Sequence, residues 1–145
     1  MILAKLVTKM SARLRHAGYK ARGIHLAVSY RDGGFWHKGA TLEKAVFDTR
    51  DIYKRAFRIL SASAYNKPVR ELAVSCFNLI KSPVSQLELF EDVVKKENLA
   101  SSIDKINERW GDFVVTPARM ISAGNAVPDR IAFGGVKELE EFTLY

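Results

Sequence analysis

Hydrophobic positions in the first third of the chain recur with two different periods. Between residues 2 and 17 they fall every three or four positions, which is the spacing of a helix that buries one face: Leu3, Leu6, Val7, Met10 and Leu14. Between residues 24 and 30, apolar residues instead alternate with small, polar or basic ones, as in a strand that buries one side. The pattern therefore predicts a helix followed by a half-buried strand.

Further elements follow in a regular order. A turn at residues 32–34 leads to a second strand at 36–46, and Asp48 is placed to cap a helix over 49–64. A third strand is expected from residue 69 to about 79. The order helix, strand, strand, helix, strand predicts an α+β fold, an antiparallel sheet with two helices packed on one face.

The net charge of +7 is divided unevenly. Residues 1–81 hold 16 Lys and Arg against 5 Asp and Glu, a net of +11, whereas residues 82–145 hold 7 against 11, a net of −4. We therefore expect residues 1–81 to form a domain that meets a polyanion. Ordinary solvated surface charge is the alternative explanation.

Composition narrows the classes of function. No run of 18 apolar residues occurs, so we expect no membrane-spanning helix. Cys76 is the only cysteine, which excludes an intrachain disulfide and favours a reducing cytoplasm; we interpret it as a buried small apolar residue. The three histidines lack the helical spacing of metal ligands, and no Gly-rich phosphate loop or acid pair is present. We expect no catalytic residue and no metal site.

The stretch SQLELFED, residues 85–92, sits where the charge changes sign. Leu87, Leu89 and Phe90 are either anchors for a pocket on another protein or residues that pack onto their own domain. Residues 82–92 thus form a linker that carries a candidate docking motif.

Residues 93–145 are expected to form a helical and irregular tail. Asn98 is placed to cap a third helix with Leu99, Ile103, Ile106 and Trp110 on one side, and residues 113–116 are typical of a short strand. Trp36 and Trp110 are both predicted to be core residues.

Three stretches, GYKARGIHLAVSYRD, FDTRDIYKRAFRIL and VRELAVSCFNL, resemble the little finger domain of Y-family translesion DNA polymerases. The later stretches QLELFED, IDKINERWGDFVVTPARM and VPDRIAFGG resemble the tail of bacterial members called DNA polymerase IV or UmuC-like. The likeness covers most of the 145 residues and follows the family's order of elements.

The resemblance implies a non-catalytic part of an error-prone polymerase that acts in DNA repair, damage tolerance and the SOS response. In that family the motif docks on the bacterial sliding clamp, which assigns clamp binding to Gln86, Leu87, Leu89 and Phe90. Contacts with the backbone of a primer–template duplex are implied for residues expected together on one sheet face: Arg22, His25, Tyr30, Arg31, Lys38, Gly39, Thr41, Arg70 and Ser75.

The family's little finger begins with a further strand, and its nucleotidyltransferase activity resides in a palm domain that binds Mg²⁺. Neither that first strand nor the palm domain matches any part of this chain. We therefore expect the chain to be a carboxy-terminal piece of such a polymerase, with no cofactor of its own. An uncovered sheet edge favours self-association, or capture of the segment 113–116.

Two alternatives stay open at this point. One is a stand-alone regulator that binds the clamp or another protein and has no role in DNA synthesis. The other is an RNA-binding module, which would place exposed aromatic residues in mid-strand. The outward positions His25, Ala27 and Ser29 argue against RNA binding.

Overall fold

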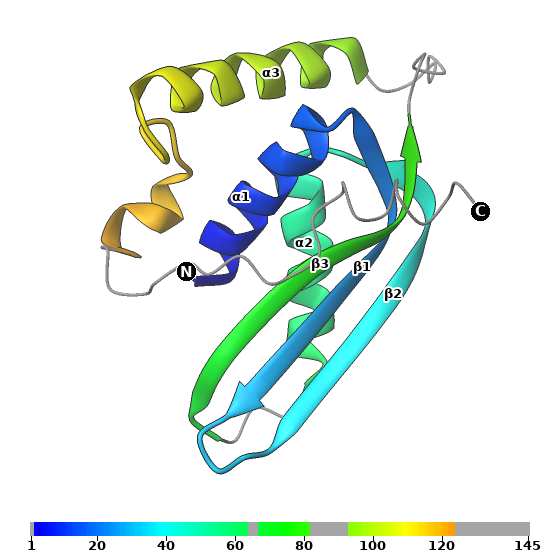
Figure 1. Ribbon diagram of the computed structural model, residues 1–145, viewed down its shortest axis with the longest axis vertical. Helices are drawn as coiled ribbons and strands as arrows, with labels where there is room; N and C mark the ends of the chain where they lie inside the picture. The colour runs from blue at the N-terminus through cyan, green and yellow to red at the C-terminus, as the bar shows by residue number, and fades with distance from the viewer. Residues whose placement is uncertain (1, 64–66, 82–92, 124–145) are drawn as a thin grey trace, which may run out of the picture.

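The computed structural model describes residues 2–63, 67–81 and 93–123. Its elements follow the predicted order and then continue into the tail (Figure 1). They are α1 (Ile2–His16), β1 (Tyr19–Tyr30), β2 (Phe35–Val46), α2 (Thr49–Ser61), β3 (Val69–Lys81), α3 (Val93–Trp110) and the 3-10 helix η1 (Ala118–Ala123). None of the helices in these ranges combines the length and apolarity needed to cross a bilayer.

The three strands form one antiparallel sheet in the order β2-β1-β3. Helices α1 and α2 both pack on the same face of this sheet, and the core lies between the two layers. Ile24 and Leu26 on the central strand and Val7 and Ile52 on the helices have no exposed surface. The predicted α+β class, with two helices on one face of an antiparallel sheet, is confirmed.

The local signals that begin and end these elements act as expected. The Asp48 side chain accepts hydrogen bonds from the backbone N–H groups of Arg50 and Asp51, which caps the N-terminus of α2. Gly18 has a φ of +75° and follows α1, a conformation that costs glycine little. Gly33, with a φ of +85°, supplies the turn between β1 and β2.

The tail differs from its prediction in two ways. Helix α3 begins at Val93 rather than near Asn98, and part of its apolar side faces solvent: Leu99 is 61% exposed and Trp110 is 66% exposed. The prediction of a buried Trp110 is therefore wrong, whereas Trp36 does pack against the core. Ala100 is the buried residue of α3.

The segment 113–116 forms turns and bends rather than a strand. Phe113 has a φ of +70°, which an extended strand does not allow, and its ring lies under the ammonium groups of Lys5 and Lys9 at 5.7 and 5.6 Å. The segment thus contacts α1 and does not cover the sheet edge, so the expected capture is wrong.

Charged side chains attach α3 to the rest of the fold. The Arg15 guanidinium donates two hydrogen bonds to the Asp104 carboxylate, at 2.6 and 2.7 Å, and Lys20 donates to Glu97 at 2.8 Å. Figure 1 shows α3 at the end of the sheet opposite the β1–β2 turn, beside the end of α1. The acidic tail thus neutralises part of the basic domain.

Candidate nucleic-acid interface

The face of the sheet turned away from α1 and α2 has no second layer in the part of the chain that the structure describes. Strand register places its side chains in rows that cross all three strands. From one end to the other the rows are Thr41–Gly23–Phe77, Gly39–His25–Ser75, His37–Ala27–Ala73 and Phe35–Ser29–Glu71. We call this surface the open face.

Several residues assigned to DNA binding from the sequence do meet on the open face. His25 on the central strand is in register with Gly39 on one neighbour and Ser75 on the other, so these three form one row. Thr41 lies in the next row, and Arg22 is exposed at the same end of the sheet. Their placement together was predicted, and contact with DNA stays a prediction.

The expectation that all nine assigned residues share one face is wrong for Tyr30 and Lys38. Tyr30 is 8% exposed because it continues the inward alternation of Leu26 and Val28. Lys38 is paired with Leu26 and therefore lies on the helix side of the sheet, although its side chain reaches solvent. Neither side chain belongs to the open face.

The two remaining assigned residues lie near the turn between β1 and β2. Arg31 is exposed within that turn, and its backbone N–H donates to the carbonyl of Pro68 at 3.0 Å. Arg70 is exposed where the register of β1 and β3 shifts, and its Nε lies 3.6 Å from a carboxylate oxygen of Glu71.

Next to these arginines, Lys67 and Asp32 form an ion pair with an N–O distance of 2.6 Å. The hydrogen bond from Lys67, helped by one from the Gly34 backbone, holds the pKa of the Asp32 carboxyl below its usual value. The same bond raises the pKa of Lys67. Lys67 is therefore charged but already partnered.

Positive charge lies at the ends of the open face rather than on it. Its four rows contain no lysine or arginine, and their single charged residue is Glu71. Arg22 stands at one end, and Arg31 and Arg70 stand at the other. The arrangement allows phosphate contacts at two separated places, with small and aromatic groups between them.

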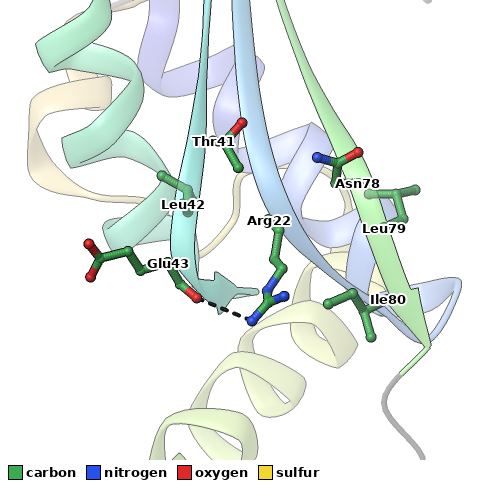
Figure 2. Close-up of a pocket in the computed structure, with 7 residues that line it drawn as sticks. All are labelled: Arg22, Thr41, Leu42, Glu43, Asn78, Leu79 and Ile80. Carbon is green, nitrogen blue, oxygen red and sulfur yellow. Dashed lines mark hydrogen bonds between the residues drawn. The ribbon is translucent and has the colours of Figure 1, made fainter.

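A shallow pocket of about 440 Å³ lies at the Arg22 end, where the register of β1 and β2 shifts. Figure 2 shows the Arg22 side chain directed toward β2, where its guanidinium donates to the carbonyl of Glu43 at 3.3 Å. The lining residues are Arg22, Thr41, Leu42, Glu43, Asn78, Leu79 and Ile80. The lining thus includes one basic residue, Arg22, and one acidic residue, Glu43.

Sequence reasoning missed two aromatic residues of the open face, Phe77 and His37. The signal for Phe77 was present, because Cys76 was interpreted as buried, and Leu72, Val74 and Cys76 alternate along the same strand. The same alternation turns Phe77 outward.

Two further kinds of site, a reactive cysteine and a metal site, have little support among the described residues. Burial raises the pKa of the Cys76 thiol to about 11, so the thiol is protonated at neutral pH and is a poor nucleophile. Within residues 2–63, 67–81 and 93–123, no three His, Cys, Asp or Glu side chains gather where they could hold a metal ion. The docking motif with Gln86, Leu87, Leu89 and Phe90 lies outside the described residues.

Comparisons with known proteins identify the family of the chain. Residues 1–89 match the family model described as the impB/mucB/samB family C-terminal domain. The chain is 31% identical over 141 residues to DNA polymerase IV 2 of Bacillus subtilis (strain 168), an alignment that covers 93% of this chain and 34% of that protein.

Two further relatives have similar coverage. The chain is 27% identical over 141 residues to the putative UV-damage repair protein UvrX of the same organism, which covers 94% of this chain and 34% of that protein. It is 24% identical over 131 residues to DNA polymerase IV of Pelotomaculum thermopropionicum, with 90% and 33% covered. The chain thus spans about a third of the length of the relatives it matches. It belongs to the impB/mucB/samB family and corresponds to the carboxy-terminal region of a Y-family DNA polymerase.

Proposed function

We propose that this chain is the DNA-binding and clamp-docking portion of a translesion DNA polymerase. Residues 1–81 contact the backbone of a primer–template duplex, and the motif at residues 86–90 docks on the sliding clamp. The open face carries the first part of the proposal. Both α1 and α2 pack on the other side, so no described helix or strand covers this side, and exposed arginines stand at each of its ends.

A salt titration tests DNA binding. Labelled primer–template of several sequences is titrated with the chain at increasing salt, and affinity should fall steeply because bound phosphates release counterions. Replacing Arg22 with alanine should weaken binding about equally for all sequences and reduce the salt slope by about 1. Arg58→Ala is the matched control, because Arg58 is an exposed arginine of α2 on the helix side.

Two results would contradict backbone binding. One is an affinity that does not respond to salt, and the other is a strong preference for one base sequence. An Arg58→Ala variant as weak as Arg22→Ala would move the interface away from the open face.

Clamp docking is tested by replacing Leu89 and Phe90 together with alanine. If both residues are anchors for a partner, the variant loses binding to a bacterial sliding clamp and keeps its thermal midpoint. If they pack into their own domain, each large side chain lost should cost about 2–5 kcal/mol of stability, and a large drop in melting temperature would refute docking.

The edge of β3 that faces away from β1 supports a third part of the proposal, association of two copies. No described residue pairs with that edge, and the helix-side residues Leu72, Val74 and Cys76 are only partly covered, whereas Ile24 and Leu26 on β1 are fully buried. A second copy that adds its own β3 would extend the sheet and cover them. Sedimentation velocity over a range of concentrations should show a dimer, and a monomer at every concentration would refute this part.

We place the activity of the whole polymerase outside this chain. Nucleotidyl transfer with Mg²⁺, in DNA repair and damage tolerance, belongs to a longer polymerase, about a third of whose length corresponds to this chain. The predicted cytoplasmic location is consistent with a role in DNA repair.

One observation favours a second candidate, a regulator that acts through protein contacts alone. Leu99, Ile106 and Trp110 leave an apolar stripe of α3 exposed. In that case the chain would bind the clamp or another protein but would bind no primer–template even at low salt.

A further inference from the structure

The ring of Phe77 lies on the backbone of the central strand. A Cβ atom added to Gly23 would stand 2.4–2.6 Å from three ring atoms of Phe77, so the ring occupies the space directly above that glycine. A Cβ on Gly39 would meet the same ring at 3.5 Å and the His25 ring at 3.5 Å. Phe77 thus leans from β3 across β1 toward β2, and its ring and the His25 ring lie on either side of the space above Gly39.

Two more rings continue from this point along the open face. The centroids of the His25 and His37 rings are 5.3 Å apart, and those of His37 and Phe35 are 5.5 Å apart. The Nε2 atom of His25 also lies 3.2 Å from Nδ1 of His37. Phe77, His25, His37 and Phe35 therefore lie in four successive rows of the open face, and we call this set the aromatic stripe.

Sheet stability explains only part of this arrangement. An aromatic ring that covers a cross-strand glycine stabilises a sheet, which accounts for Phe77 above Gly23. It does not account for His37, which is exposed, or for Phe35, which is 66% exposed. One side of the Phe77 ring lies against the backbone of β1, so its other side faces away from the sheet, on the open face.

The charge pattern favours bases over phosphates along the stripe. The rows that hold the aromatic stripe contain no lysine or arginine, and the exposed arginines stand at the two ends of the sheet. A single strand whose phosphates reach those ends would have its bases over the rings between them. Every base has a flat π-face, so stacking on such rings is largely independent of sequence.

We propose that the aromatic stripe binds unpaired bases of single-stranded DNA by stacking, with Phe77 as its principal platform. The inference deepens the proposed function, since it rests on DNA being the ligand of the open face. It adds a contact with the unpaired template next to the duplex contacts proposed above.

The test separates bases from backbone. The probes are labelled oligothymidylate of about 12 nucleotides and a strand of the same length and charge made of abasic sites, each measured by fluorescence anisotropy. We expect the base-containing strand to bind about tenfold more tightly, since both strands offer the same phosphates. A blunt duplex is measured in parallel as a readout of the proposed function alone.

Phe77→Leu keeps an apolar side chain and removes the ring. It should bring oligothymidylate binding down about tenfold, to the abasic level, and weaken blunt-duplex binding much less, because a blunt duplex offers no unpaired base to the ring; Phe77→Tyr should keep wild-type binding to both. Phe57→Leu is the matched control, because Phe57 is a 51% exposed aromatic residue on α2. Gly23→Ala is a second probe: its new methyl group must displace the Phe77 ring and so should weaken oligothymidylate binding with the ring still present.

Thermal midpoints of all variants show whether they are folded. The inference is overturned if the wild-type chain binds the two single strands with equal affinity. It is also overturned if a folded Phe77→Leu variant binds oligothymidylate like the wild type. In either case, binding of the blunt duplex would still support the proposed function. A chain that binds neither the single strands nor the duplex overturns both. If Phe77→Leu does not fold, Gly23→Ala decides in its place.

Discussion

Helices α2 and α3 are both amphipathic, yet they are held in opposite ways. Helix α2 turns its apolar side to the sheet and buries Ile52, Ala56 and Ile59. Helix α3 buries Ala100 and leaves Leu99 largely exposed. The difference teaches that an apolar stripe at helical spacing shows which side of a helix could be buried. The surface against which the helix packs decides which side is buried in the structure.

The partner available to α3 is charged. The surface of α1 and the start of β1 present Arg15 and Lys20, and α3 meets them with Asp104 and Glu97. Partly exposed ion pairs each contribute little compared with a buried apolar side chain, so we expect α3 to be the less stable of the two helices.

The largest effect is expected from removing apolar volume under α2. Ile52 has no exposed surface, so Ile52→Ala leaves a cavity between helix and sheet. Chemical denaturation should show a loss of about 2–5 kcal/mol in the free energy of unfolding. A loss below about 1 kcal/mol would mean that α2 is not held by its apolar face.

A smaller and local effect is expected at the ion pair of α3. Asp104→Asn keeps the shape of the side chain and removes the charge that faces Arg15. We expect about 1 kcal/mol less stability for α3 alone, seen as faster amide exchange in α3 with exchange in the sheet unchanged. High salt should have the same effect in the wild type, because it screens the pair.

Glu108→Gln is the control for that measurement, because it removes the same charge from the exposed side of α3. Equal acceleration in both variants would show that α3 depends on its total charge and not on the contact with Arg15.

The smallest effect is expected on the apolar side of α3. Leu99→Ala removes a side chain that is 61% exposed, so the free energy of unfolding of the isolated chain should change by no more than about 0.5 kcal/mol. A loss as large as that of Ile52→Ala would show that another part of the chain or a second copy covers this side in solution.

Much of the fold could be predicted from short-range patterns. The alternation of apolar and polar residues located the strands. Asp48 caps α2 as its side-chain chemistry predicts, and Gly18 ends α1 because glycine readily adopts a positive φ. Contacts in the tail could not be predicted in the same way. Phe113 belongs to an apolar run typical of a strand, but the lysines on α1 that attract its ring are far away in the sequence.

The candidate site shows the same limit. The open face with His25 and Ser75 follows from alternation along each strand, and the same alternation put Tyr30 on the buried side, against the DNA contact that the family resemblance implied for it. Lys38 is different, because its side of the sheet depends on how β2 is registered against β1. Register is set by pairing between strands, which a single strand's pattern does not contain.

The close approach of Phe77 to Gly23 ties two positions that are distant in the sequence. With the ring in place, position 23 has no room for any side chain, so glycine there is a consequence of the aromatic residue on β3. Among homologous chains, we expect loss of the aromatic residue at position 77 to be accompanied by residues larger than glycine at position 23. The two positions should therefore covary, as a pair inherited together.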